Sequence, residues 1–215
     1  VLLACDGHSW ASRLRAVLPL SELLGCVSWG YMLLQWEVGV DVRDFGGGRT
    51  GMSNVLRNGG AKSAVVVLTL DIGKGVVAVV RAREVFCANG AGVAAGLIVL
   101  AGHNWPVFLQ FKGGRGILTA LGGLALMVPV AAIIATATFL TVIALSRYIS
   151  LGSVIGVTIG ALAILALALA GVNSGTYMVY GFIASAMLVW QHRDNLQRIR
   201  DGNERRLGQP ATKVE

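Results

Sequence analysis

The stretch GHNWPVFLQFKGGRGILTALGGLALMVPVAAIIATATFLTVIALSR, residues 102–147, decides how often this chain crosses a membrane. Its first part combines a histidine and two cations with a cluster of glycines, and its second part, 117–146, is almost entirely apolar. The apolar part forms either one long tilted helix or two helices broken near Pro129. The number of spans, and with it the side on which each loop lies, depends on which of these two is correct.

The composition of the whole chain is that of a membrane protein. Of its 215 residues, 55% are hydrophobic and only 13% are charged, and the mean hydropathy is +0.69. A soluble domain carries about a quarter charged residues, and apolar runs long enough to cross a bilayer recur along this chain. We therefore predict an all-α integral membrane protein. The predicted spans are 18–36, 63–80, 86–103, 117–128, 130–146, 151–170 and 175–191.

The distribution of cations favours two helices in 117–146, and hence seven transmembrane helices. With seven spans, Arg147 and the C-terminal tail lie on the same side as the basic loops before them, and only four arginines lie on the other side. Because cytoplasmic loops carry the excess of Lys and Arg, the N-terminus is predicted outside and the C-terminus in the cytoplasm. The segment 117–128 is short, about 18 Å as a helix, so one or two of the seven helices are predicted to be short.

This topology divides the chain into three parts. They are an N-terminal extracytoplasmic segment 1–17, a transmembrane domain 18–192 and a charged cytoplasmic tail 193–215. The net charge of +7 follows from the topology, so nucleic acid is not a predicted partner. Cys5 and Cys87 lie near span ends on one predicted side, and a disulfide between them stays open.

Two predicted cytoplasmic loops are rich in glycine, and each precedes a helix-like run. They lie within the segments 41–62 and 102–123. Successive backbone N–H groups and a helix N-terminus bind phosphate. The run GGGRTGMS is similar to a nucleotide-binding loop, but Met52 stands where the lysine belongs and no strand precedes it, so nucleotide hydrolysis is not predicted. We predict a phosphate-handling site at the cytoplasmic membrane surface, with 102–123 as its cradle.

Two features inside the spans allow both a structural and a functional interpretation. Asp71 and Lys74 are spaced i, i+3 in the second span. They either form a structural ion pair or shape a buried polar pocket. Small residues four apart in GSVIGVTIG, 152–160, favour close helix packing over a glycine-lined acyl groove.

Five segments together resemble the motifs of the bacterial acyl-phosphate:glycerol-3-phosphate acyltransferases, the PlsY family. GHNWPVFLQFKGGRGILTALG is similar to GHxxPxFxxFKGGKGxATxxG, and LDIGKG to LDxxKG. GGGRTGMSNVLRNGG is similar to GSGNxGxTNxxRxxG, RYISLGSV to RYxSLxSI, and HRDNLQRI to HRxNIxRL. The segments occur in the family's order and cover the chain from about 20 to 200.

The resemblance implies a multi-pass enzyme of the bacterial cytoplasmic membrane. The family moves the acyl group of acyl phosphate to the 1-hydroxyl of glycerol 3-phosphate. The products are lysophosphatidic acid and phosphate, in the first step of phospholipid synthesis. The implied partners are these two substrates and the lipid bilayer. No cofactor or metal is implied, and nothing indicates a protein partner.

The site residues implied by the resemblance stand at matching motif positions. The implied catalytic residues are Asn54, Arg115, His192 and Asn195. The implied substrate-binding residues are Gly47, Gly48, Arg49, Gly51, Ser53, Arg57, Lys112, Gly113, Gly114, Arg147 and Ser150. The arginines would bind phosphate, the asparagines would orient substrate, and the histidine would bind phosphate or help to fix the site.

The first glycine-rich motif departs from the family. Gly47 and Arg49 replace its serine and first asparagine, and Arg115 replaces the second lysine of FKGGKG. Arginine keeps the charge but presents a planar fork in place of a compact ammonium. Two alternatives therefore stay open. One is a diverged member that acylates another phosphorylated acceptor. The other is a small anion transporter, although such a protein should show internal repeats and none is found.

Overall fold

The computed structural model of the protein describes residues 10–209, and over this range the chain is helical. Two short 3-10 turns, η1 (Val42–Asp44) and η2 (Val107–Leu109), lie in the loops. The α-helices are α1 (Trp10–Cys26), α2 (Trp29–Glu37), α3 (Met52–Phe86), α4 (Asn89–Asn104), α5 (Ile117–Met127), α6 (Pro129–Ser146), α7 (Ile149–Leu169), α8 (Thr176–Gln191) and α9 (Arg193–Arg200).

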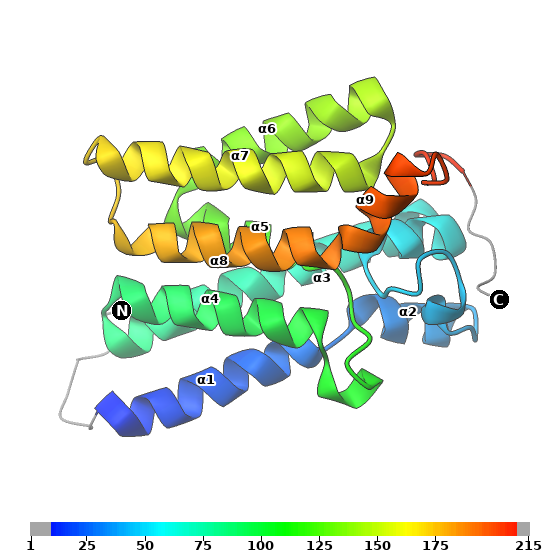
Figure 1. Ribbon diagram of the computed structural model, residues 1–215. Coiled ribbons are helices and arrows are strands. Elements are labelled where there is room, and N and C mark those ends of the chain that lie inside the picture. The colour runs from blue at the N-terminus through cyan, green and yellow to red at the C-terminus, as the bar shows by residue number, and fades with distance from the viewer. Residues whose placement is uncertain (1–9, 210–215) are drawn as a thin grey trace.

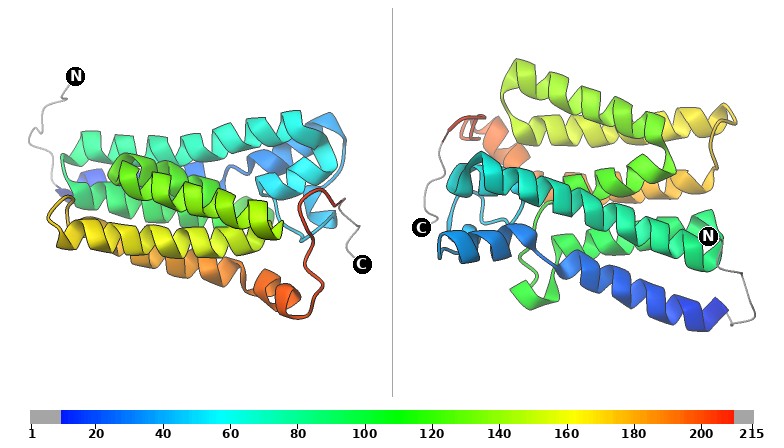
Figure 2. Two further views of the ribbon diagram at one scale, coloured as in Figure 1. Left: turned by 90° about the horizontal axis from the view of Figure 1, so that it is seen from above. Right: turned by 180° about the vertical axis from the view of Figure 1, so that it is seen from behind.

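Successive long segments run in alternating directions along one bundle (Figure 1). The loops 38–51 and 105–116, the junction 147–148 and helix α9 gather at one end. The turns after α3 and α7 lie at the other end, and the views from above and from behind agree (Figure 2). The sequence prediction that the basic loops share one side is consistent with this arrangement.

Among the described residues, five segments are long and apolar enough to span a membrane, and α5 is a shorter apolar helix. The five are Val17–Glu37, Met52–Phe86, Asn89–Leu109, Pro129–Ser146 and Ile149–Leu169. The predicted break in 117–146 is confirmed, because α5 ends at Met127 and α6 starts at Pro129. Proline is favourable at the first position of a helix, where no intrahelical partner is lost. The open Cys5–Cys87 pairing involves residue 5, which lies outside the described range.

Two predicted spans differ from the structure in detail. The span predicted at 18–36 is broken at Val27 and Ser28 into α1 and α2. The span predicted at 63–80 begins earlier, at Met52, and is kinked at Gly60, whose φ is +79°. The polar first turns of α3 hid its start from a hydropathy pattern, since apolar periodicity begins only after the kink.

Glycines allow the helices to approach closely. A Cβ on Gly25 of α1 would collide with the Val99 carbonyl of α4, and one on Gly75 of α3 would collide with the Thr119 carbonyl of α5. Along α7, a Cβ on Gly156 would meet the Ala135 carbonyl of α6 at 3.0 Å. Close packing is therefore one role of the small residues in 152–160, as predicted.

A polar network joins four helices at the end opposite the basic loops. The Arg83 guanidinium donates to the Leu126 carbonyl at 3.1 Å and to the Tyr177 hydroxyl at 2.8 Å. The Tyr177 hydroxyl in turn donates to Asn89 Oδ1 at 2.7 Å. These bonds tie α3, α4 and α8 to the C-terminal end of α5.

We expect Gly75→Ala to destabilise the protein by about 1–3 kcal/mol, because the new methyl group overpacks the α3–α5 contact. Gly73→Ala, two residues away on the same helix, is the matched control, since a Cβ there meets nothing within 4 Å. It should be neutral or stabilising by up to about 1 kcal/mol. Thermal unfolding of both variants in detergent checks this, and equal melting temperatures would contradict the packing role of Gly75.

Candidate active site

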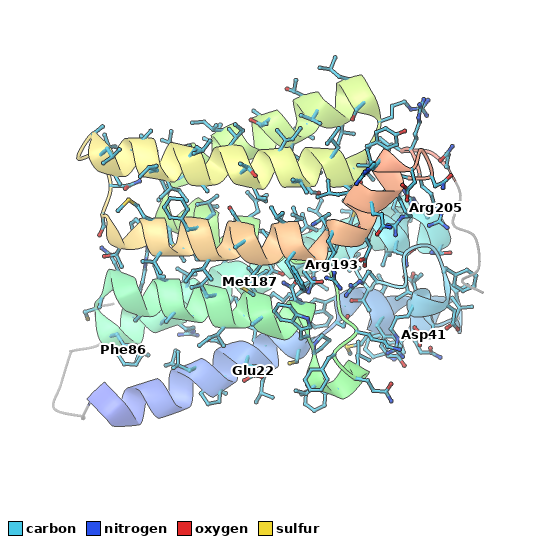
Figure 3. The ribbon with its side chains drawn as sticks, in the orientation of Figure 1. Glu22, Asp41, Phe86, Met187, Arg193 and Arg205 are labelled. Atoms are coloured by element: carbon cyan, nitrogen blue, oxygen red, sulfur yellow. The ribbon has the colours of Figure 1, made fainter. Side chains whose placement is uncertain are left out.

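A chamber of about 290 Å³ lies at the end of the bundle where the basic loops gather. Side-chain sticks show nitrogen-rich groups at this end, near Arg193 and Arg205, whereas Phe86 marks the opposite end (Figure 3). Ten predicted site residues line the chamber. They are Gly47, Arg49, Gly51, Ser53, Asn54, Arg57, Arg115, Ser150, His192 and Asn195.

Three helices begin at the chamber. Met52, Ile117 and Ile149 are the first residues of α3, α5 and α7, and all three line it. The first N–H groups of a helix have no intrahelical partner and carry partial positive charge. The chamber wall therefore attracts anions even before its arginines are considered.

Arg115 reaches the chamber without a partner for its guanidinium. Its Nε is buried and unpaired, and within residues 10–209 no hydrogen bond or ion pair holds this side chain. Burial, together with the nearby Arg49 and Arg198, lowers the pKa of Arg115 to about 10. The guanidinium therefore stays charged at neutral pH and is available to bind an anion.

Arg49 adds a second, weakly paired cation. Its guanidinium lies 4.0 Å from Asp194 Oδ2, and half of that carboxylate is exposed. Burial lowers the pKa of Arg49, while Asp194 partly offsets this effect. At such a distance and exposure the ion pair is worth little, so Arg49 remains available to an anionic ligand.

Asn54 shapes the first glycine-rich loop. Its Nδ2 donates to the carbonyls of Val42, Phe45 and Arg49 at 2.8–2.9 Å. One amide therefore gathers the turn 42–49 against the start of α3. Gly46 and Gly48 both have positive φ, near +64°, which permits this tight path.

Glu204 is a residue of the chamber lining that the sequence analysis missed. Its carboxylate accepts from Ser150 Oγ at 2.7 Å, from Asn195 Nδ2 at 2.6 Å and from Arg198 Nε at 2.8 Å. Burial would raise the pKa of Glu204, but these three bonds outweigh it and keep the pKa below its ordinary value. There was little signal in the sequence, because Glu204 is one of several acids among the arginines of the tail, as Asp194 and Asp201 are, and an exposed tail has the same composition.

The contacts of Asn195 and His192 leave two hydrogen-bond acceptors at the chamber. Because Asn195 Nδ2 donates to Glu204, its Oδ1 points elsewhere, and this oxygen is buried and unpaired. The His192 Nδ1 lies 2.7 Å from the Leu188 carbonyl, which can only accept, so Nδ1 carries the proton and Nε2 is an acceptor. Burial, followed by the charge of Arg115, lowers the pKa of His192 to about 4.

Five predicted site residues lie outside the chamber lining. Lys112 is exposed, and Gly113 and Gly114 pack against His103. The fourth, Gly48, lies in the turn described above. The last, Arg147, has φ +63° and exchanges hydrogen bonds with Leu207 at 2.7 and 2.9 Å, so it fastens the tail that carries Glu204.

A second, apolar cavity of about 390 Å³ adjoins the chamber. It runs between α3, α5, α6, α7 and α8, and Gly156 and Gly160 line it. The glycine-lined groove, the less favoured interpretation of 152–160, is therefore present together with the close packing. The residues shared by both cavities are Met52, Ile117, Leu118, Phe139, Leu140 and Ser153.

The arrangement indicates a ligand with an anionic head and a long apolar tail. The head would lie among arginines and helix N-termini, and the tail would lie in the groove. Over the range 10–209, no group of three or more His, Cys, Asp or Glu side chains is placed to hold a metal ion.

A family model described as glycerol-3-phosphate acyltransferase matches residues 16–202. Glycerol-3-phosphate acyltransferase 3 of Dehalococcoides mccartyi (strain CBDB1) is 42% identical over 213 residues, which covers 93% of this chain and 98% of that protein. The matched region includes every residue of the chamber lining up to Arg198.

The fold is similar to two crystal structures of PlsY (YgiH), an integral membrane glycerol 3-phosphate acyltransferase. The glycerol 3-phosphate form is 31% identical, with a TM-score of 0.83 over 92% of this chain and 96% of that one. The lysophosphatidic acid form is 29% identical, with a TM-score of 0.80 over the same shares.

We expect the buried neutral His192 to make stability depend on pH between about 6.5 and 4. In that window the unfolded chain binds a proton that the folded chain rejects, so stability falls as the pH falls. The full effect is on the order of 3 kcal/mol. His192→Asn keeps a donor for the Leu188 carbonyl and should lose less stability. Melting temperatures at pH 7 and pH 5 check this, and parallel losses in both proteins would contradict it.

Proposed function

The chain belongs to the PlsY family of glycerol-3-phosphate acyltransferases, and we propose that it transfers a fatty acyl group from acyl phosphate to glycerol 3-phosphate. The acyl group goes to the 1-hydroxyl, and the products are lysophosphatidic acid and inorganic phosphate. The observation that carries this proposal is the junction of a cationic chamber with an apolar groove, because each substrate has a phosphate and one also has a long tail.

The chamber residues support two separate roles: cations would bind the phosphate groups, and hydrogen-bond acceptors would bind the glycerol hydroxyls. Arg49, Arg57 and Arg115 would bind the two phosphate groups, together with the helix N-termini. Asn195 Oδ1 and His192 Nε2 would accept hydrogen bonds from the glycerol hydroxyls, since neither atom is a donor in this structure. Glu204 would hold Asn195 in the required orientation.

The chemistry needs positioning more than a strong protein nucleophile. The oxygen of the 1-hydroxyl forms a bond to the acyl carbon, and the bond between that carbon and the phosphate oxygen breaks. Negative charge grows on the carbonyl oxygen and on the leaving phosphate, and fixed cations stabilise both. The departing phosphate can take the hydroxyl proton itself. Holding the two substrates side by side in the chamber removes much of the entropic barrier.

The residues that depart from the family motif are compatible with this activity. Gly47 does not have positive φ, so its backbone would accept any side chain. A Cβ there would lie 3.2 Å from a terminal nitrogen of Arg115, and nothing else lies within 4 Å. The absent side chain therefore leaves room for a guanidinium, which is larger than an ammonium.

We propose the predicted topology for the whole chain. Its seven passes place the N-terminus outside and the chamber and C-terminus at the cytoplasmic side, in a bacterial cytoplasmic membrane. The loops at the chamber end carry most of the cations, which supports this orientation. The proposed parts are 1–17, 18–192 and 193–215, although α9 and Glu204 of the last part pack against the chamber.

Purified protein in lipid should release phosphate from palmitoyl phosphate only when glycerol 3-phosphate is added. Asn195→Ala should lower this rate on the order of 100-fold, as expected for loss of a positioned hydrogen bond. Asn203→Ala removes an amide from the exposed part of the same tail, outside the chamber lining, and should leave the rate unchanged. Inactivity of well-folded protein with this acceptor would reject the proposal and direct the search to other phosphorylated acceptors.

A second assay tests the groove. Leu121→Trp places a large ring in the apolar cavity and should lower kcat/KM for palmitoyl phosphate at least about tenfold more than for a short-chain acyl phosphate. Ile133→Trp is the control, because this side chain is 69% exposed on α6 and outside the groove. An equal loss for both chain lengths would place the acyl chain elsewhere.

A further inference from the structure

Three ionisable side chains form a buried cluster at the inner end of the chamber. Lys74 Nζ lies 2.9 Å from Asp71 Oδ1 and 2.6 Å from His103 Nδ1. The three residues are only 2–5% exposed, and Asp71 and His103 line the chamber. The reaction described above uses none of them.

Lys74 fixes both the cluster and the break between the first two helices. Its ammonium donates to the carbonyls of Val27 at 3.2 Å and Gly25 at 3.4 Å, where α1 ends. A cation at these free carbonyls stabilises a helix C-terminus. Because an ammonium can only donate, His103 Nδ1 accepts from Lys74, and the proton of the neutral ring is on Nε2.

The loop that carries Arg115 also packs directly on His103. The Gly114 N–H donates to the His103 carbonyl at 3.1 Å. A Cβ on Gly114 would collide with the His103 ring, and one on Gly113 would collide with the His103 carbonyl. Neither glycine has positive φ, so close approach, and not backbone conformation, is the reason for glycine at both positions.

We propose that His103, held by Lys74, is a positioning residue that aims Arg115 into the chamber. The guanidinium of Arg115 has no hydrogen bond or ion pair within residues 10–209 that could aim it. Its direction is therefore set by the backbone immediately before it, which rests on the His103 ring. This role rests on the proposed function only in that Arg115 binds a substrate phosphate.

A simpler role for the cluster is to hold α1, α3 and α4 together. That role predicts a general loss of stability when His103 is changed. The positioning role predicts in addition a local effect on residues 111–116 and a kinetic effect that requires Arg115. Tyr177→Phe is a matched control, since it breaks a buried polar network at the opposite end of α3 and α4.

Hydrogen–deuterium exchange tests, independently of activity, whether His103 holds the loop 111–116 in place. In His103→Ala, the amides of 111–116 should exchange at least tenfold faster than in the wild-type protein, and in Tyr177→Phe they should not change. His103→Asn, which keeps an acceptor for Lys74, should give an intermediate rate and guards against misfolding of the alanine variant. Unchanged exchange of this loop in both His103 variants would overturn the proposal.

A double-mutant cycle tests the consequence for substrate binding. His103→Ala should raise KM for at least one phosphate substrate about tenfold or more, with a smaller change in kcat, when Arg115 is present. In an Arg115→Gln background the same change should add less than twofold. Effects that multiply in the double variant would overturn the proposal while leaving the acyltransferase function intact. Inactive wild-type protein would reject the proposed function. The exchange experiment would then still decide whether His103 positions the loop 111–116.

Discussion

Positive charge with too few partners is the constraint around which this molecule is organised. Arg49, Arg57 and Arg115 face one half-enclosed chamber into which three helix N-termini also point. Burial and mutual repulsion lower the pKa of Arg115, yet it stays charged at neutral pH. The structure tolerates this charge by supplying Glu204 and a distant Asp194. Two phosphate-bearing substrates would complete the neutralisation, so in the proposed mechanism both binding and catalysis would depend on these poorly neutralised cations.

Glycine residues allow the apolar helices and the polar loops of the site to approach one another closely. Helices that lack side chains at their crossings pack closely enough to fix the chamber wall, as at Gly75 against α5. The same device seats the second glycine-rich loop, where Gly113 and Gly114 lie directly on His103. Lys74 connects the helix packing to this loop, because its ammonium binds the carbonyls at the end of α1 and also contacts His103. The buried ion pair is thus a structural element with a second role at the site.

Much of this could be predicted from the sequence, and the remainder has identifiable physical reasons. Hydropathy and the positions of cations predicted the helix break at Pro129 and the end at which the loops gather. Motif resemblance predicted ten residues that line the chamber. The start of α3 was missed because its first turns are polar. Glu204 was missed because it lies outside the five motif segments, and the sequence does not show that the chain folds back to bring it to Ser150 and Asn195. Gly113 and Gly114 were predicted to bind substrate, but a sequence cannot show that the His103 carbonyl lies beside the first and the His103 ring beside the second.

Binding of glycerol 3-phosphate without turnover tests the central claim most directly. A ligand that binds only the folded protein raises the melting temperature as its concentration rises. Glycerol 3-phosphate should stabilise the wild-type protein in this way, glycerol should not, and Arg115→Gln should lose most of the shift while retaining its own fold. Equal stabilisation of the wild-type protein and Arg115→Gln would contradict the account, because the anion would then bind somewhere other than beside Arg115 in the chamber.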